Sequence, residues 1–287
     1  MMQKKISCRR GLAVSCLTSL VCLPMPGCAW PTSGPVAAAR AELTVAAASD
    51  LQLAFTEIAR QFEQQESCRV VLTFGSTGQL ARQIEHGLPV DIFAAANIAY
   101  LDPLEAKRMI VPHSRQIYGR GRIVLVSSKK AGSVVRTLDD LLKPDVKHVA
   151  IANPGHAPYG VAARHALERT GLWGRLESKI VLGENVRQAL QYVETGNAEA
   201  GIVALSIAQG SNVEYTLVDE SLHEPLDQAL AIVAGTKQEG LARQFIAFLT
   251  GPAGRPIMQK HGFLLASETS TEATSRQDVT SETPPAR

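Results

Sequence analysis

VVLTFGSTGQL, at residues 70–80, is the stretch that decides the fold. Its first half is an apolar run with the length and composition of a buried strand. The residues from Leu80 onward follow the spacing of one helix face, which Gly87 and Pro89 bring to an end. The stretch therefore predicts a β-strand that passes through a short Gly-Ser-Thr-Gly link directly into an α-helix.

The same alternation continues on both sides of this stretch. Residues 43–48 form a short apolar run, residues 51–62 carry apolar side chains at helical spacing, and residues 92–96 form a further strand-like run. A second series of strands and helices starts near residue 123 and extends to residue 249. Repeated β-α-β units of this kind predict parallel sheets with helices on both faces.

The fresh start near residue 123 favours a division into two parts. We expect an α/β fold with two lobes and a ligand cleft between them. Residues 42–121 and 229–266 would form lobe 1, and residues 122–228 would form lobe 2. Strands near residues 119–126 and 226–233 would cross between the lobes, and closure about such crossovers is a hinge motion. A single sheet that holds every strand is the alternative.

The first 41 residues have the features of an export signal. Basic residues precede the apolar stretch 11–23, which is too short to span a membrane, and Ala39-Arg40-Ala41 offers a cleavage site. We therefore predict a periplasmic mature protein that starts at Glu42. Cys28 follows a poor match to a lipobox, so a lipid anchor at this residue is the alternative.

The last segment, residues 267–287, is rich in Ser, Thr, Glu and Pro and has almost no large apolar residue. Such a segment cannot bury enough apolar surface to offset the conformational entropy of ordering the chain. We expect it to be a disordered tail.

The composition argues against two classes of function. The predicted signal holds five of the 29 basic residues and none of the 27 acidic ones, which leaves a mature chain with 24 basic residues and a net charge of −3. A nucleic-acid partner therefore has no electrostatic support. Four of the five cysteines also lie in the signal, so Cys68 alone predicts neither an internal disulfide nor a cysteine metal site.

The strand-to-helix junctions are the best candidates for a binding site. Four of them combine small residues with Ser, Thr, Asp or Asn: residues 46–50, 74–80, 153–160 and 183–187. In an open α/β sheet such junctions lie at the carboxyl edge, where ligands bind. A helix start presents unpaired N–H groups and a partial positive charge, so an anion fits there without a cationic side chain. Ser49 and Thr77 can each add a hydroxyl donor.

Ordinary helix capping is the simpler interpretation of any single junction, because Ser, Thr, Asp and Asn are also the preferred N-caps. Ser76 with Gln79, for example, fits a capping box. The occurrence of four junctions, two in each predicted lobe, favours an anion-binding cleft over capping alone.

Motifs for catalysis are missing from the sequence. No Ser-His-Asp arrangement, phosphate-binding loop or Cys-His pair stands at a recognisable spacing. The histidines are scattered and show no metal-ligand spacing. We therefore expect a binding protein and not an enzyme.

Several stretches together resemble one known family. They are residues 46–49 (AAAS), 74–84 (FGSTGQLARQI), 89–93 (PVDIF), 153–154 (NP), 158–160 (PYG), 186–190 (VRQAL) and 201–204 (GIVA). Through them residues 42–266 resemble the periplasmic molybdate-binding proteins of ABC importers, which have the type II periplasmic-binding-protein fold. The stretches occur in the order and at the spacing of that family.

The resemblance implies a set of ligand residues. Ser49 and Thr77 would donate their hydroxyls, and Val186 its backbone N–H, to the oxygens of molybdate or tungstate, with no bond to the metal itself. Many members also place a tyrosine after Gly-Ile-Val, where this chain has Ala204. A smaller branch has Pro-Tyr-Gly earlier in the chain, so Tyr159 would supply the phenol donor.

Asp50 stands where that branch can use Asn. We expect its backbone N–H, and not its carboxylate, to face the anion, with an ordinary N-cap role as the alternative. Neutral donors suit a fully ionised oxyanion such as molybdate. Hydrogen phosphate would need an acceptor for its proton, and Asp50 is the one nearby candidate.

The resemblance also implies a role in transport. We expect a monomer that captures molybdate or tungstate without any cofactor and delivers it to the permease of an ABC importer in the inner membrane. Another oxyanion, such as sulfate or phosphate, is the alternative ligand. An enzyme on a related two-lobed fold and a signalling module that uses the cleft as a sensor also remain open.

Overall fold

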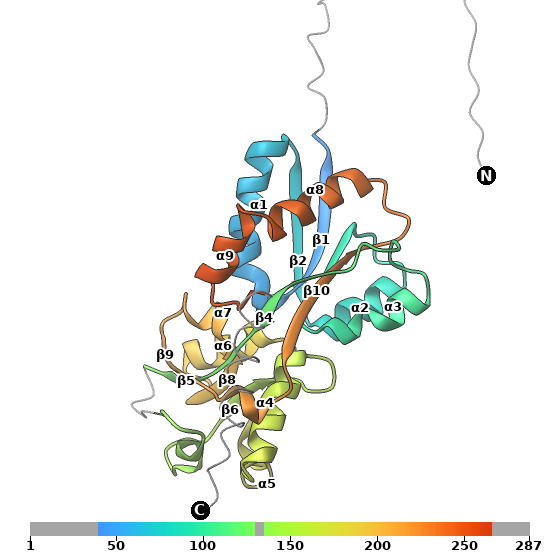
Figure 1. The fold of residues 1–287 in the computed structure, drawn as a ribbon. Coiled ribbons are helices and arrows are strands. Elements are labelled where there is room, and N and C mark those ends of the chain that lie inside the picture. Colours follow the sequence, from blue (N-terminus) through green and yellow to red (C-terminus); the bar gives the residue numbers. More distant parts are fainter. Residues whose placement is uncertain (1–39, 130–134, 266–287) are drawn as a thin grey trace, which may run out of the picture. The chain divides into compact units, whose positions relative to one another are not determined.

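A computed structural model describes residues 40–129 and 135–265 of the chain. The described residues form two five-stranded sheets with helices packed on them (Figure 1). The predicted α/β fold with two lobes is thereby confirmed, and the single-sheet alternative is wrong. We call the part built on the first sheet lobe 1 and the part built on the second sheet lobe 2. Cys28 and the predicted tail lie outside the described residues.

The sheet of lobe 1 takes strands from both ends of the described chain. In spatial order they are β2 (Arg69–Gly75), β1 (Glu42–Ala48), β3 (Ile92–Ala95), β10 (Leu226–Ile232) and β4 (Gln116–Gly121). β1 pairs in parallel with β2 and β3, and its register sets Ala48 beside Gly75. The carboxyl ends of these three strands therefore lie at the same edge of the sheet.

The sheet of lobe 2 has a similar plan. In spatial order its strands are β7 (Ile180–Gly183), β6 (Val149–Ala152), β8 (Ala200–Ala204), β5 (Ile123–Ser128) and β9 (Val213–Leu217). β6 pairs in parallel with β7 and β8. Only Arg122 separates β4 from β5, so the chain passes from the first sheet to the second at this residue. It returns between β9 and β10. The exact lobe boundaries stay a prediction.

The prediction of parallel sheets is wrong, because both sheets are mixed. β10 runs antiparallel to β3 and β4, and β5 runs antiparallel to β8 and β9. Both strands come directly after a crossover between lobes. A strand that arrives from the other lobe enters its sheet at the carboxyl edge of the parallel strands, so it must run in the opposite direction.

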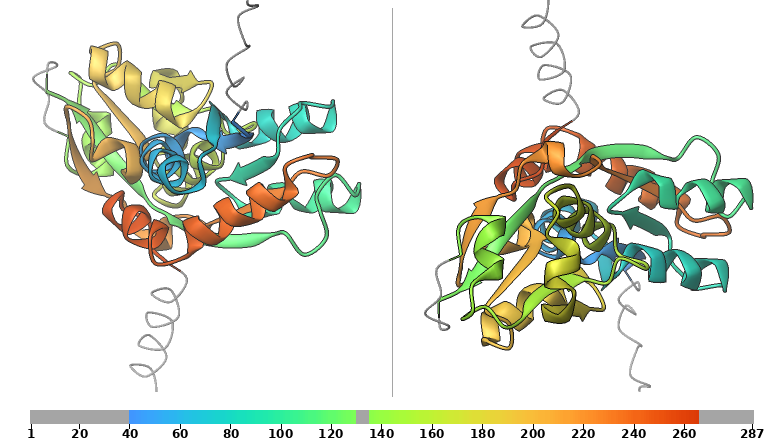
Figure 2. Two further views of the ribbon diagram at one scale, coloured as in Figure 1. Left: turned by 90° about the horizontal axis from the view of Figure 1, so that it is seen from above. Right: turned by 90° about the horizontal axis from the view of Figure 1, so that it is seen from below.

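Helices cover both faces of the first sheet, as predicted. Along β1, Val45 and Ala47 pack in the cluster that contains α1 (Gln52–Glu66) and α8 (Glu239–Thr250), whereas Ala46 packs with α2 (Thr77–Glu85). This alternation is the two-residue period of a strand that is buried on both sides. Figures 1 and 2 show α1 and α8 close together, with α2 in a separate layer.

Aromatic rings join the two helices of the first layer. The ring of Phe245 on α8 lies 5.2 Å from that of Phe62 and 6.1 Å from that of Phe55, both on α1. Such edge-on contacts add to the apolar burial of the side chains. The layer supports the strand β1 and the turn that follows it.

On the second sheet pack α4 (Pro158–Arg169) and α6 (Val186–Thr195). The other helical segments are short: α3 (Asp102–Ala106), α5 (Trp173–Leu176), α7 (Leu205–Ala208), α9 (Gly254–Lys260), and the 3₁₀ turns η1 (Ser49–Leu51), η2 (Ile98–Tyr100), η3 (Leu138–Leu142), η4 (Glu177–Lys179) and η5 (Glu220–Leu222). Within residues 40–129 and 135–265 no helix is both long enough and apolar enough to cross a membrane.

The sequence pattern does not predict β7 or β9. Both are edge strands, and most of their residues are exposed or only partly buried. The apolar run of β7 is only Ile180-Val181-Leu182, shorter than that of a typical buried strand, and β9 has polar residues between its apolar ones. The backbone pairing with β6 and β5 decides their conformation instead.

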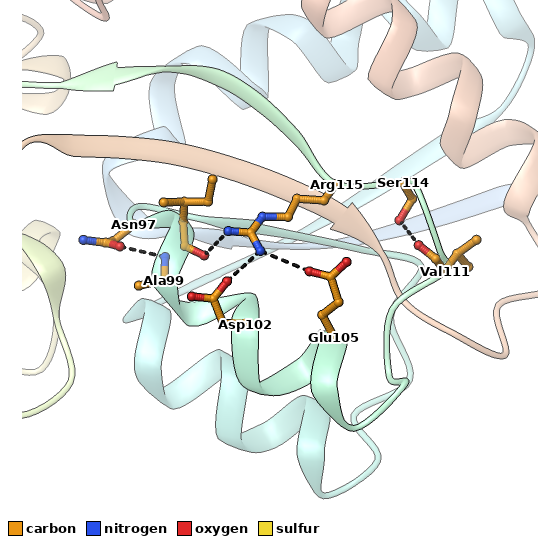
Figure 3. A network of polar contacts seen from close by, with 8 residues as sticks. Asn97, Ala99, Asp102, Glu105, Val111, Ser114 and Arg115 are labelled. Atoms are coloured by element: carbon orange, nitrogen blue, oxygen red, sulfur yellow. Dashed lines mark hydrogen bonds and ion pairs between the residues drawn. The ribbon is translucent and has the colours of Figure 1, made fainter.

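A polar network fixes the connection between β3 and β4 (Figure 3). Arg115 donates from Nη1 to Asp102 and Glu105, at 2.6 and 3.1 Å, and from Nη2 to the carbonyl of Ile98. Its guanidinium thereby holds η2 and α3 against the start of β4. The same connection begins beside Ala96, which lines the cavity described next.

Candidate functional site

A small cavity lies where the two lobes meet. Its volume is about 10 Å³, and residues of both lobes form its wall. Lobe 1 contributes the carboxyl ends of its parallel strands and lobe 2 the first residues of α4 and α6. The wall consists of Ala48, Ser49, Asp50, Gly75, Ser76, Thr77, Ala96, Ala157, Pro158, Tyr159 and Val186. Among the described residues no Lys, Arg or His lines it.

The five predicted ligand residues, Ser49, Asp50, Thr77, Tyr159 and Val186, all line this one cavity. They are separated by as many as 137 positions in the chain, and the topology brings them together. Their role as ligands stays a prediction, whereas their proximity is a property of the fold.

Thr77 is well placed to donate a hydrogen bond. It is the first residue of α2 and is fully buried. Its Oγ1 accepts the backbone N–H of Ala96 at 3.1 Å, so the hydroxyl proton remains for another acceptor. Ser49 is also buried, and its hydroxyl makes no hydrogen bond within the described part of the chain. Both side chains can therefore give a proton to a group in the cavity.

Val186 contributes through its backbone. It is the first residue of α6, so its N–H has no acceptor within the helix. Asn185 caps the same helix and accepts the N–H of Gln188 at 3.1 Å. The ordinary N-cap interpretation therefore applies to Asn185 and leaves the Val186 N–H at the cavity wall.

The capping-box prediction for Ser76 is wrong. The Ser76 side chain makes no cap hydrogen bond with α2. Its hydroxyl lies 2.7 Å from the carbonyl oxygen of His156 and 2.7 Å from the Nδ1 of the same residue. A contact with the other lobe replaces the local one.

Two further hydrogen bonds join the lobes beside Ser76. The Gly78 N–H donates to the His156 carbonyl at 2.9 Å, and Gln79 Nε2 donates to Glu184 at 2.7 Å. We call Ser76, Gly78, Gln79, His156 and Glu184 the latch. Burial lowers the pKa of the His156 imidazole more than Glu184 raises it, which favours the neutral ring. Because the latch joins the two lobes at Ser76, a residue of the cavity wall, the structure is that of a closed form.

Tyr159 and Asp50 lie in a buried network that also links the lobes. The Tyr159 hydroxyl donates to Asp50 Oδ2 at 3.0 Å and accepts from Gln228 Nε2 at 3.0 Å. Gln228 Nε2 also donates to Asp50 Oδ2 at 2.7 Å. The Tyr118 hydroxyl lies 2.9 Å from Gln228 Oε1. The Asp50 carboxylate of η1 thus accepts from α4 and β10, and β4 joins the network through Gln228.

The crossover glycine makes room for this network. A Cβ at Gly121 would overlap the Tyr159 hydroxyl and come within 2.6 Å of Gln228 Nε2. Only glycine therefore lets the phenol pass over the last residue of β4. The Tyr159 hydroxyl has one proton, and it donates that proton in a hydrogen bond to Asp50. It could donate to a bound anion only if this hydrogen bond were broken.

Asp50 is the unusual member of the site. Its side chain makes no cap hydrogen bond, so the N-cap alternative is wrong. It is 1% exposed, and its Oδ1 has no hydrogen-bond partner among the described residues. Burial raises the pKa of Asp50 to about 6, although hydrogen bonds from Gln228 and Tyr159 act in the opposite direction.

The sequence pattern does not identify Gln228, Tyr118 or His156 as site residues. Gln228 lies 178 positions from Asp50, and His156 lies 80 positions from Ser76. Gln228 and Tyr118 belong to no local motif, and His156 lies in the predicted junction 153–160 without a role of its own. A buried polar residue within an apolar strand, such as Gln228 in β10, is the one signal that could have indicated a partner.

We predict that Asp50→Asn stabilises the mature protein at pH 8 and not at pH 4. A carboxyl with a raised pKa is favoured in its protonated form by folding, so its ionisation reduces stability as the pH rises from 4 to above 6. A shift of this size corresponds to about 3 kcal/mol, and Asn removes the cost. Urea unfolding at both pH values measures the difference.

Asp139→Asn, on the exposed side of η3, is the matched control and should change neither value. Equal stability differences for Asp50→Asn at pH 4 and pH 8 would contradict the assignment of the cost to ionisation of Asp50.

Comparisons with known proteins agree with this geometry. The family model described as bacterial extracellular solute-binding protein matches residues 43–264. The molybdate-binding protein ModA of Azotobacter vinelandii is 37% identical over 234 residues, which cover 79% of this chain and 91% of the relative. ModA of Escherichia coli strain K12 is 33% identical over 242 residues, 81% of this chain and 93% of the relative.

A solved structure extends the likeness to three dimensions. The periplasmic molybdate-binding protein of Azotobacter vinelandii matches with a TM-score of 0.73 and 30% identity, over 78% of this chain and 99% of that one. Both the sequence and the fold point to proteins that bind solutes and not to enzymes. The chain therefore belongs to the family of bacterial extracellular solute-binding proteins.

Proposed function

We propose that this chain captures molybdate or tungstate outside the cytoplasm and delivers it to the permease of an ABC importer. The observation that carries the proposal is the cavity between the lobes, whose wall offers neutral donors from both sides and no cation among the described residues. The relatives named as molybdate-binding proteins support the choice of anion.

The size of the cavity argues for a small ligand. Its volume of about 10 Å³, room for about one water-sized group, is far below the roughly 300 to 1,000 Å³ of pockets that hold drug-sized molecules. A tetrahedral oxyanion has only a few heavy atoms and presents acceptors in every direction. The Ser49 and Thr77 hydroxyls and the Val186 N–H can reach it from different sides, and helix starts stabilise its charge.

Tyr159 remains a proposed ligand, with a condition. Its hydroxyl donates a hydrogen bond to Asp50 Oδ2 in the closed form described here. Donation to the anion would require that Asp50 no longer accept this proton. Tyr159 otherwise contributes to the wall and to the contact between the lobes.

Closure of the two lobes would distinguish the ligand-bound protein from the free protein. An anion held by donors of both lobes favours the closed form, because it binds that form better than the open one. The latch and the crossovers at Arg122 and before β10 are the elements that would change. We propose that the closed monomer docks on the permease and releases the anion there, with no cofactor involved.

The proposed site of action is the periplasm. The family description places such proteins outside the cytoplasm. Cleavage after Ala41 would give a free periplasmic protein, and a lipid anchor at Cys28 would tether the same protein to a membrane. Mass spectrometry of the exported protein distinguishes the two forms.

Isothermal titration calorimetry with the mature protein tests the ligand. We expect one site for molybdate and for tungstate with a Kd at or below about 1 µM, equivalent to about 8 kcal/mol. Sulfate and phosphate should bind more weakly by at least tenfold. Thr77→Val removes one donor at nearly constant volume and should weaken molybdate binding by about 1 to 3 kcal/mol.

No heat with molybdate or tungstate, together with clear binding of sulfate or phosphate, would overturn the choice of anion. The alternative of a phosphate-binding protein then gains a specific test. Asp50→Asn replaces the carboxylate near the cavity with a neutral amide, a weaker acceptor, and should impair binding of hydrogen phosphate.

The latch generates a separate prediction. In Gly78→Ala the new Cβ would lie 2.7 Å from the His156 carbonyl oxygen, so the lobes could not close fully. Alanine favours the helix that contains this residue, so lobe 1 should stay folded. We expect molybdate affinity to fall at least tenfold, about 1.4 kcal/mol.

Gly174→Ala on α5 meets open space and is the matched control. Small-angle scattering should show that molybdate compacts the control and leaves Gly78→Ala unchanged. Compaction and affinity equal to those of the control would show that the latch does not contribute to closure.

A further inference from the structure

Asp50 is a buried acidic residue in the wall of a cavity that we propose binds an anion, and the proposed function does not explain its presence there. It is the only acidic residue in the wall of the cavity among the described residues. Its Oδ2 accepts from Gln228 and Tyr159, while its buried Oδ1 has no partner. A buried oxygen without a partner is costly and is uncommon in a native structure. The free oxygen belongs to a residue that a bound anion would contact.

The charges make the conflict sharper. A tetrahedral dianion in this cavity would lie beside the Asp50 carboxylate with no cation between them. Like charges this close in a buried site raise the pKa of the weaker acid. The wall offers no Lys, Arg or His within the described ranges to offset the repulsion.

The groups around Asp50 do not supply the missing charge. Three side chains face Asp50: Tyr159 from α4, Tyr118 from β4 and Gln228 from β10. Burial raises the pKa of both phenols well above the usual range, so both phenols stay neutral. Four other elements pack against η1: α1, α6, α7 and β2.

Their ionisable side chains point to other partners or to solvent. Glu57 pairs with Lys260, Arg69 with Glu42, and Arg187 with Glu194. Glu63 accepts the N–H of Val70. Arg60 and Glu66 are exposed, Tyr192 on α6 is partly buried, and α7 has no ionisable residue. Asp50 therefore meets the anion without a charged neighbour.

We propose that Asp50 is a proton-carrying ligand, which takes one proton onto Oδ1 as a fully ionised oxyanion enters and donates that O–H to an oxygen of the anion. This inference rests on the proposed function and adds a specificity device to it. The proton comes from solvent, and no covalent bond of the anion is formed or broken. The complex holds one proton more than the separate protein and anion.

The position of the proton follows from the contacts. Oδ2 already accepts two hydrogen bonds, from Gln228 and Tyr159, so Oδ1 is the oxygen with room for a proton. Once protonated, Asp50 is a neutral donor like the other groups in the wall. A monohydrogen oxyanion would instead bring its own proton to the ionised carboxylate. Uptake of a proton therefore distinguishes fully ionised anions from protonated ones.

Calorimetry in several buffers counts this proton. Sodium molybdate is titrated into the mature protein at pH 8 in buffers that differ in ionisation enthalpy. The slope of the observed enthalpy against the buffer enthalpy gives the protons taken up. We expect about one per anion for the native chain and for the exposed control Asp139→Asn, and none for Asp50→Asn.

The pH dependence of affinity gives a second readout that needs no variant. Above the pKa of free Asp50, the affinity of the native chain for molybdate should fall about tenfold per pH unit. Asp50→Asn should show no such fall and should bind more tightly than the native chain at pH 9, because the amide donates without a proton from solvent.

The outcomes separate this inference from the proposed function. Molybdate binding with no buffer dependence and no change between pH 7 and pH 9 overturns the role of Asp50 and leaves the proposed function standing. Proton uptake that persists in Asp50→Asn assigns the proton to another group and also overturns it. No molybdate binding in any buffer contradicts the proposed function, and this inference with it.

Discussion

Helix starts that converge on one cavity are the feature on which the rest of the structure depends. The parallel pairing of β1 with β2 sets Ala48 beside Gly75, so the turns that follow both strands lie at one edge. α4 and α6 bring their first residues to the same place from the other lobe. Backbone N–H groups and two hydroxyls then face one small space that no cation lines among the described residues, and helix starts of this kind favour an anion.

The mixed sheets follow from the same requirement. A cleft between lobes needs a chain that leaves the first sheet and returns to it, and the returning strands must start at the cleft. β5 and β10 do so and therefore run against their neighbours. The crossover also shapes the site, because Gly121 at the end of β4 gives the Tyr159 phenol its path to Asp50.

Asp50 is unfavourable both for the stability of the fold and for the binding of an anion. Burial of a carboxylate with one free oxygen reduces stability, and a neutral donor would suit an anion better. Such conflicts are expected at functional sites. Here the acid also joins η1 of lobe 1 to α4 of lobe 2, so its state of protonation bears on both the ligand and the contact between the lobes.

Much of this architecture could be predicted from the sequence, and the reasons for the failures are specific. Residues 70–80 form the strand β2 and the start of α2 as predicted, because an apolar run and a helical period are local signals. The position of Thr77 follows from that junction. Tyr159 came only from the resemblance to a family, since no spacing rule singles out a tyrosine after a proline.

The remaining contacts depend on tertiary structure. The capping-box prediction for Ser76 failed because the His156 carbonyl lies within reach of its hydroxyl, and a contact across 80 positions leaves no pattern in the chain. Gln228 and Tyr118 were missed for the same reason. The edge strand β7 has only a three-residue apolar run, and β9 has none, so neither carries the longer run that identifies a buried strand.

A crystal structure of the mature protein with molybdate, with anomalous data collected at the molybdenum edge, tests the central claim most directly. We expect one molybdenum peak inside the cavity, with oxygens at about 2.7 to 3.2 Å from Thr77 Oγ1 and the Val186 nitrogen. The metal–oxygen bond lengths would identify the anion. A saturated crystal whose peak lies elsewhere, or beside a cationic side chain, would contradict the account.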